Sequence, residues 1–127
     1  MQPQNNKKIF IVDDDSFLID MYALKFTQAG FFVESFLDPS LALEKLRAGG
    51  NPDVLLVDVV MPVMTGFELL EKINAESLAK NSAKIILSNR GEEKDIEKGK
   101  SLGVNGYIIK ANATPNEVVE KVMNSIK

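Results

Sequence analysis

The sequence predicts an α/β domain built on a doubly wound parallel sheet, and two observations lead to this fold class. Short apolar segments alternate with segments of helical spacing along the whole chain of 127 residues, as is typical of parallel strands joined by helices. Residues 54–57 are apolar at every position, which is typical of a strand buried on both faces. The length suits one domain, so we expect one sheet of five strands with five helices.

The first half of the chain supplies two strands and two helices. We expect strands at 7–12 and 31–36, and helices at 16–29 and 39–48 that each end at a glycine. The apolar side chains that we expect on the buried sides of these helices are Phe17, Leu18, Met21, Leu24 and Phe26 in the first and Leu41, Leu43 and Leu46 in the second.

The second half supplies three strands and three helices. The expected elements are strands at 54–57, 84–88 and 107–109, with helices at 67–75 and 92–102 between them. The final helix follows Thr114, which is expected to cap it. Pro115 takes the first helical position and Glu117 completes a capping box.

The helix at 92–102 differs from the others because it has almost no apolar stripe. It also contains Gly99, which costs roughly 1 kcal/mol relative to alanine inside a helix. A helix without a buried face gains little from packing. We therefore expect it to be the most mobile helix.

The composition excludes several functions. A net charge of −3 argues against direct binding to nucleic acid. The chain has no cysteine and no histidine, so a metal must be a hard cation held by oxygen. No apolar run is long enough to span a membrane, and the start of the chain does not resemble a secretory signal. We expect a cytoplasmic protein with a flexible leader at 1–6 and one domain at 7–127.

Polar residues end four of the predicted strands, at the edge of the sheet where such folds place their functional sites. In chain order they are Asp13-Asp14-Asp15, Asp58, Ser88 and Lys110. Clustered carboxylates repel one another and raise their pKa values. Mg²⁺ removes that repulsion and also binds phosphoryl oxygens. A metal, a lysine, a hydroxyl and a nucleophilic carboxylate together indicate phosphoryl transfer.

These motifs resemble the receiver domains of two-component response regulators over nearly the whole chain, from residue 8 to about 126. The resemblance rests on Ile-Val-Asp-Asp-Asp at 11–15, on the segment 57–66, on Ser88 and on Gly-Tyr-Ile-Ile-Lys at 106–110. The part from Asp58 to Gly66 is the most specific. The resemblance implies a flavodoxin-like sheet with strand order 2-1-3-4-5.

The resemblance also implies that Asp58 is the phosphoacceptor. It would attack the phosphohistidine of a sensor histidine kinase or a histidine phosphotransfer protein. Asp14 and Asp58 would bind Mg²⁺ directly together with the backbone carbonyl of Val60, and Asp13 would act through a metal-bound water. Such a protein is a signalling switch that catalyses only its own phosphorylation and dephosphorylation.

The same resemblance assigns Lys110 and Ser88 to the phosphoryl oxygens. Ser88 and Tyr107 would form the switch: the aromatic ring turns inward when the hydroxyl moves to the phosphate. This change would alter the face made by helix four, strand five and helix five. A downstream protein would read that face, and helices four and five are a candidate surface for a phosphorylation-dependent homodimer.

Three positions depart from the family pattern. Ala111 follows Lys110 where the family usually has a proline in a cis peptide, and we expect a trans bond because cis costs about 2.5–4 kcal/mol before other residues. Asn89 stands where alanine or glycine is common and is expected to crowd the site. Val60 and Arg90 occupy positions that tune the lifetime of the aspartyl phosphate. Because Val60 is apolar and cannot orient a water, we expect slow self-dephosphorylation.

Other interpretations compete with this one. The acids at 13–15 would suit a helix N-terminus, and Tyr107 could simply pack at the sheet edge. A hydrolase of the haloacid dehalogenase type needs a second aspartate where this chain has Val60. A flavodoxin-like cofactor binder needs a Ser/Thr/Gly-rich loop after the first strand. A degenerate receiver that binds partners without phosphorylation stays open because of Asn89 and Ala111.

Overall fold

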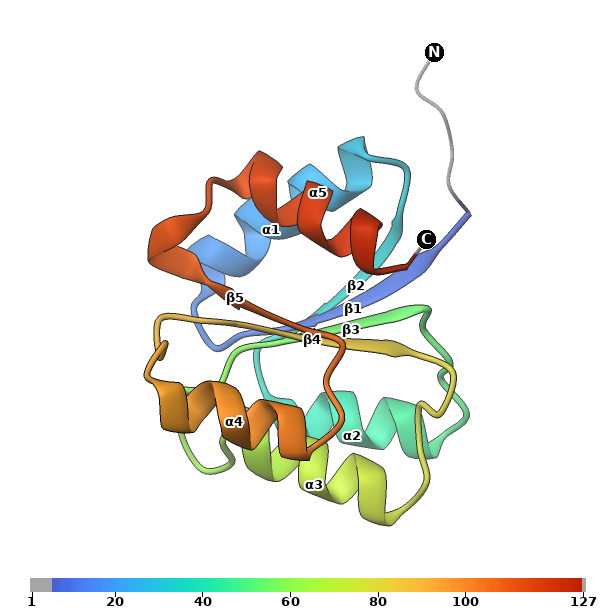
Figure 1. The fold of residues 1–127 in the computed structure, drawn as a ribbon. Coiled ribbons are helices and arrows are strands. Elements are labelled where there is room, and N and C mark those ends of the chain that lie inside the picture. Colours follow the sequence, from blue (N-terminus) through green and yellow to red (C-terminus); the bar gives the residue numbers. More distant parts are fainter. Residues whose placement is uncertain (1–5, 127) are drawn as a thin grey trace.

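The computed structural model describes residues 6–126 and confirms the predicted fold class (Figure 1). Five parallel strands form one sheet in the order β2-β1-β3-β4-β5. The strands are β1 (Lys8–Val12), β2 (Phe32–Phe36), β3 (Val54–Val57), β4 (Ala83–Ser88) and β5 (Gly106–Ile109). The helices are α1 (Ser16–Gln28), α2 (Pro39–Arg47), α3 (Gly66–Ala75), α4 (Glu93–Ser101) and α5 (Pro115–Ser125).

The observed elements follow the predicted ones, with ends that differ by at most one residue. A short 3₁₀ helix, η1 (Lys110–Asn112), follows β5 and was not predicted. Of the expected leader, residues 1–5 lie outside the described residues. None of the helices between residues 6 and 126 is both long and apolar enough to cross a membrane.

The helices form two layers, with α1 and α5 on one face of the sheet and α2, α3 and α4 on the other (Figure 1). Side chains of a strand alternate between faces, so β1 contributes to both cores. Ile9 and Ile11 lie in the core beneath α1 and α5, while Phe10 and Val12 lie in the core beneath α2 and α3. All four residues of β3 are buried, as the apolar run at 54–57 predicts.

The predicted buried side of α1 was only partly right: Phe26 is fully buried, and Leu18 and Met21 pack against the core. Phe17 is 77% exposed and Leu24 is 57% exposed, whereas the buried residues of the helix are Ile19, Tyr22 and Phe26. These three follow the three- and four-residue spacing of a single helical face. Apolar residues occur on both sides of α1, so the pattern alone did not identify which side packs on the sheet.

The buried side of α2 was only partly predicted. Leu43 and Leu46 are buried as expected, together with Ala42, but Leu41 is 52% exposed. The packed face of this helix therefore includes Ala42, a small residue that the spacing of the leucines did not indicate.

Polar side chains cap three of the helices that follow the site strands, α1, α3 and α5. The Asp15 side chain accepts hydrogen bonds from the backbone N–H groups of the first turn of α1. Thr114 and Glu117 form the predicted capping box of α5, and Thr65 and Glu68 form a second one at α3 that was not predicted. These caps satisfy N–H groups that a helix leaves free at its start.

Helix α4 packs on the sheet through a glycine. Gly99 is buried, and a Cβ at this position would lie 3.1 Å from Ile86 and 3.2 Å from Tyr107. The absence of a side chain therefore allows the helix to approach β4 and β5 closely. Gly99 has a packing role that the helix propensity alone did not indicate. The mobility of α4 stays a prediction.

Candidate functional site

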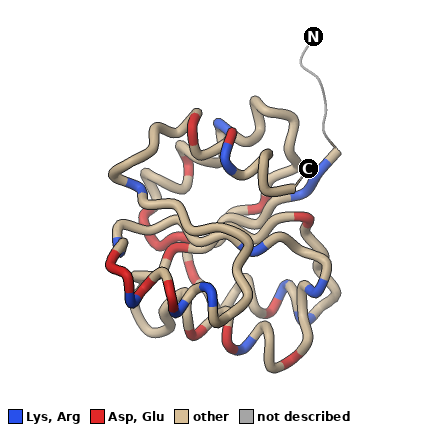
Figure 2. Tube along the Cα trace, in the orientation of Figure 1, with Lys and Arg blue, Asp and Glu red and all other residues tan. Residues whose placement is uncertain are grey.

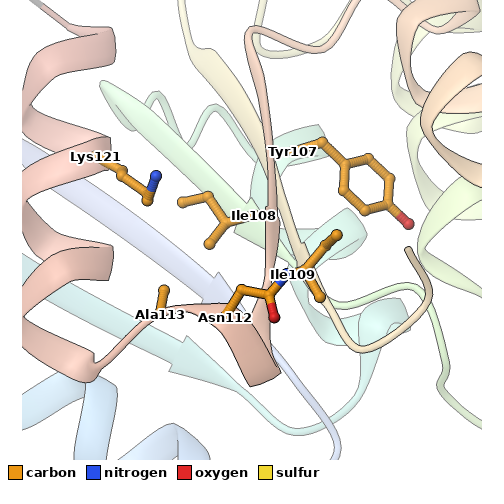
Figure 3. Close-up of a pocket in the computed structure, with 6 residues that line it drawn as sticks. All are labelled: Tyr107, Ile108, Ile109, Asn112, Ala113 and Lys121. Carbon is orange, nitrogen blue, oxygen red and sulfur yellow. The ribbon is translucent and has the colours of Figure 1, made fainter. Parts of the chain in front are cut away.

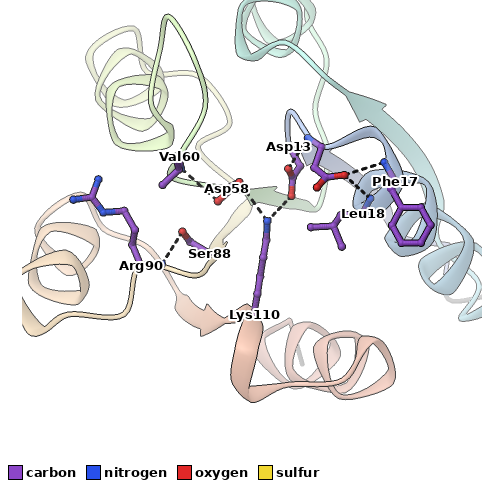
Figure 4. A network of polar contacts seen from close by, with 9 residues as sticks. Asp13, Phe17, Leu18, Asp58, Val60, Ser88, Arg90 and Lys110 are labelled. Atoms are coloured by element: carbon purple, nitrogen blue, oxygen red, sulfur yellow. Dashed lines mark hydrogen bonds and ion pairs between the residues drawn. The ribbon is translucent and has the colours of Figure 1, made fainter.

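Three charged side chains meet at the carboxyl ends of the strands. The Lys110 ammonium donates to Asp13 Oδ2 at 2.8 Å and to Asp58 Oδ2 at 3.3 Å (Figure 4). Their side chains are almost fully buried, at 10% exposed for Lys110, 4% for Asp13 and 9% for Asp58. Two carboxylates therefore share one ammonium where little water reaches them.

The register of the parallel strands brings these residues together. Val12 of β1 lies opposite Val57 of β3, so the residues that follow them, Asp13 and Asp58, are neighbours at the edge of the sheet. The Asp58 N–H donates to the Val12 carbonyl and thereby continues the strand pairing.

The first residue of α3 also fixes the position of Asp58. A Cβ at Gly66 would lie 2.1 Å from the Asp58 carbonyl oxygen. Only glycine allows α3 to begin so close to the end of β3. Any other residue there would displace the backbone that carries Asp58.

Asp14 completes a group of three carboxylates. One oxygen each from Asp13, Asp14 and Asp58 lies within 4.8 Å of the others. Asp14 is exposed and the other two are buried, so the group opens to solvent on one side. Such an all-oxygen set suits a hard cation such as Mg²⁺. Asp15 next to them is engaged as the cap of α1.

The pKa of Asp58 and the pKa of Lys110 are both raised at this site. Burial raises the pKa of Asp58, and Asp13 adds to that rise, while Lys110 opposes it. Burial acts to lower the pKa of Lys110, but the hydrogen bond to Asp13 and the charges of both carboxylates outweigh it and raise the pKa overall. One lysine does not balance the carboxylates, so the site favours a second cation.

Ser88 and Tyr107 both contact the loop between β4 and α4. Ser88 is fully buried, and its hydroxyl accepts a hydrogen bond from the Arg90 N–H at 3.2 Å (Figure 4). The Tyr107 hydroxyl donates to the Arg90 carbonyl oxygen. Burial raises the pKa of Tyr107, and the nearby Asp95 carboxylate raises it further. The two predicted switch residues are thus joined through the backbone of Arg90.

The departures from the family pattern are visible around Lys110. The Lys110–Ala111 peptide is trans, as expected. A groove of about 370 Å³ lies next to it, and its walls include Tyr22, Asn89, Lys110 and Ala111. Asn89 is exposed at this groove, and its effect on access to the site stays a prediction.

A second groove lies between β5 and α5 (Figure 3). It measures about 190 Å³, and its lining includes Tyr107, Asn112 and Lys121. In Figure 3 the Tyr107 ring points away from Lys121, on the opposite side of β5.

Tyr22 lies near the site but was not predicted as part of it. Its side chain is 3% exposed. Burial raises the pKa of Tyr22, and the charges of Lys110, Asp13 and Asp58 all act on it. The only signal in the sequence is its spacing of three residues from the buried Ile19, which indicates burial and not a place beside the carboxylates.

Acidic side chains surround the site more widely. Figure 2 shows Asp and Glu residues gathered at the left of the view, where the strands end. Among the acidic residues after β1 and in α1, Asp14, Asp15 and Asp20 are exposed. A negative surface of this kind attracts cations and positively charged partner surfaces.

Comparison with protein families agrees with this geometry. Residues 9–123 match the family model described as "Response regulator receiver domain". The match covers nearly all the described residues, including the three carboxylates, Ser88, Tyr107 and Lys110.

Individual relatives agree with the family match. The chain is 30% identical over 122 residues to Regulatory protein VanRc of Enterococcus gallinarum. The aligned region covers 96% of this chain and 51% of that protein. It is 30% identical over 118 residues to Chemotaxis protein CheY1 of Helicobacter pylori, covering 91% of this chain and 93% of that one. The chain therefore spans about half the length of VanRc and nearly all of CheY1.

Solved structures show the same fold. The chemotaxis protein CheY4 of Vibrio cholerae superposes with a TM-score of 0.86 at 28% sequence identity. The superposition covers 94% of this chain and 98% of that one.

Proposed function

The chain belongs to the response regulator receiver family, and on this premise we propose that residues 7–127 form a phosphoacceptor domain in which Asp58 accepts a phosphoryl group. The observation that supports the proposal most directly is the buried contact of Lys110 with Asp13 and Asp58. Asp58 Oδ2 faces the ammonium, while Oδ1 receives only a long contact of 3.4 Å from the Val60 N–H. Oδ1 is therefore the less engaged of the two carboxylate oxygens, and we assign the attack to it.

In the proposed reaction, Asp58 Oδ1 forms a bond to phosphorus while the bond from phosphorus to the phosphohistidine nitrogen breaks. Lys110 neutralises charge on the transferring group, because its ammonium already lies beside Asp58. The Ser88 hydroxyl turns from the Arg90 N–H and donates to a phosphoryl oxygen.

Receiver domains bind Mg²⁺ at an acidic site, and the residues of this chain fit that ion. Asp14 and Asp58 would hold it together with the Val60 carbonyl, and Asp13 would act through a bound water. The bound ion supplies positive charge for the clustered carboxylates and the incoming phosphoryl group.

The proposed phosphodonor is a sensor histidine kinase or a histidine phosphotransfer protein. In the proposed output, Tyr107 follows the movement of Ser88 and changes the face made by α4, β5 and α5. A downstream protein then reads this face, and a phosphorylation-dependent homodimer through α4 and α5 is part of the same proposal. The chain catalyses only its own phosphorylation and dephosphorylation.

The proposal is tested with Mg²⁺ and acetyl phosphate by recording the intact mass of the protein. We expect one added phosphoryl group that requires Mg²⁺ and is absent in Asp58→Asn. An unmodified mass for a folded wild-type protein would contradict the proposal and favour a degenerate receiver. A group that is still added to Asp58→Asn would place the acceptor at another residue.

A further inference from the structure

Asp95 is a buried carboxylate away from the proposed phosphorylation site. It lies in the first turn of α4 and is only 6% exposed. Its nearest cation is the Arg90 guanidinium, whose Nε lies 3.7 Å from Asp95 Oδ1. This separation gives an ion pair without a short hydrogen bond. Arg90 and Asp95 therefore form an ion pair whose geometry does not include a strong hydrogen bond.

Arg90 itself lies between the site and α4. Its N–H donates to the Ser88 hydroxyl and its carbonyl accepts from Tyr107, so its backbone is anchored beside the proposed phosphoryl position. Its side chain is 50% exposed and can change direction without disturbing a packed core. Figure 4 shows Arg90 on the same side of the site as Ser88 and Val60.

We propose that Arg90 is a phosphoryl-binding residue that exchanges partners: its guanidinium pairs with Asp95 in the unphosphorylated protein and with the phosphoryl group once Asp58 carries it. This inference rests on the proposed function. It adds a residue to the site and a route from the phosphoryl group to α4.

The charges favour such an exchange. A phosphoryl group carries more negative charge than a carboxylate and offers oxygens that match the planar guanidinium. The existing contact with Asp95 is an ion pair without a short hydrogen bond, so Arg90 gives up no short hydrogen bond when it leaves.

The exchange has a consequence for α4. Once Arg90 leaves, Asp95 remains buried without its counter-ion, which is strongly unfavourable. The first turn of α4 then opens to hydrate the carboxylate. The helix is susceptible to such a change because it has little apolar surface and packs through Gly99.

A thermodynamic cycle tests the exchange with Mg²⁺ and beryllium fluoride, which mimics a phosphoryl group on aspartate. The measured quantity is the Kd of beryllium fluoride, followed by ¹⁹F NMR. We expect Arg90→Gln to raise the Kd about threefold and Asp95→Asn to lower it about threefold, the size of a partly exposed ion pair. In the Arg90→Gln background, Asp95→Asn should leave the Kd unchanged, because no arginine remains to be released.

Two further variants separate this role from a structural one. Arg90→Lys keeps the charge and should retain most of the affinity. Glu93→Gln removes an exposed carboxylate from the same turn of α4 and should have the same small effect in both backgrounds. Amide exchange at 93–101 should accelerate when beryllium fluoride binds to the wild type, but not to Arg90→Gln.

The outcomes are distinguishable. An equal effect of Asp95→Asn in both backgrounds would show that Asp95 acts without Arg90 and would overturn the exchange. An unchanged Kd in Arg90→Gln would do the same. A folded wild-type protein that binds no beryllium fluoride and gains no mass with acetyl phosphate would overturn the proposed function and this inference with it.

Discussion

The two edges of the sheet use polar side chains in opposite ways. At the amino ends of the strands, side chains bond to the backbone of the neighbouring connection. Asp53 accepts from the Lys8 N–H at 2.8 Å, the Ser82 hydroxyl donates to the Pro52 carbonyl at 2.5 Å, and Asn105 accepts from the Lys84 N–H at 2.8 Å. Each such bond joins two segments of the chain through the backbone.

At the carboxyl ends, charged groups face one another instead. Lys110 contacts two carboxylates, whereas the buried Lys84 at the other edge donates to the Ala79 carbonyl at 2.8 Å. The pKa of Lys84 is lowered by burial, while the carboxylates raise that of Lys110 despite its burial. One edge thus pairs its polar side chains with the backbone, and the other places charged side chains against one another, where a ligand can bind.

The largest expected difference between the edges is in the rate of phosphorylation. Lys110→Met removes the ammonium beside Asp58 and should slow modification by acetyl phosphate about 100-fold, as is typical when one charge-stabilising group is lost. Lys84→Met is the matched control, since it removes a buried ammonium from the other edge. Time courses of intact mass should show it at the wild-type rate. Equal slowing in both variants would mean that the edges do not differ in function.

At the amino edge we expect a substitution to lower the stability of the fold. Ser82→Ala removes the donor to the Pro52 carbonyl and leaves a buried acceptor unpaired, which costs about 1–2 kcal/mol. The free energy of unfolding, measured in urea, should fall by that amount while phosphorylation continues at the normal rate. Ser125→Ala, at an exposed hydroxyl that bonds within its own helix, should change stability less.

At the carboxyl edge we expect a substitution to raise the free energy of unfolding. Asp58→Asn should raise the free energy of unfolding by about 1 kcal/mol in the absence of metal, because it removes a buried negative charge beside Asp13. Since the folded-state pKa of Asp58 is raised, its stabilising contribution exists below the unfolded pKa of about 4 and is lost as pH rises through the folded pKa.

The gain from Asp58→Asn should therefore be largest at neutral pH and shrink as pH approaches 4. Urea unfolding with a chelator at several pH values measures it. A gain that is independent of pH would show that the charge of Asp58 is not its cause.

The smallest effect is expected at the connection between β3 and α3. Val63 has φ 71° and a fully exposed side chain. The Met64 N–H bonds to the Pro62 carbonyl at 2.8 Å, so Val63 is the central residue of a γ-turn, a strained conformation for a branched side chain.

Val63→Gly should raise the free energy of unfolding by roughly 0.5 kcal/mol, after the larger entropy of unfolded glycine is subtracted. Val63→Ala removes similar apolar surface but keeps a Cβ at positive φ, so it should gain less. Equal stability of the two variants in urea would locate the strain elsewhere.

Most of the fold was predictable from the sequence because strand and helix signals alternate without interruption. The grouping of Asp13, Asp58 and Lys110 was predictable for a related reason: parallel strands all end at the same edge. The roles assigned to these residues stay proposals, because geometry places side chains without measuring what they do.

What the sequence did not reveal depends on packing in three dimensions. Phe17 and Leu24 looked like core residues but are exposed, because α1 has apolar residues on both sides. Gly99 looked only like a weak point in a helix, yet it is the contact through which α4 reaches the sheet. The pairing of Arg90 with Asp95 joins a loop to a helix, and neither residue signals it alone.

The placement of the two tyrosines gives the molecule its own optical reporters. The chain has two tyrosines and no tryptophan, so Tyr22 and Tyr107 dominate its near-ultraviolet absorbance and emission. They lie in the opposite cores of the sheet, and the charge of Asp58 acts on both phenols. A change in the charge at Asp58 therefore acts on one phenol on each side of the sheet, and tyrosine absorbance offers a way to look for it in the unlabelled protein.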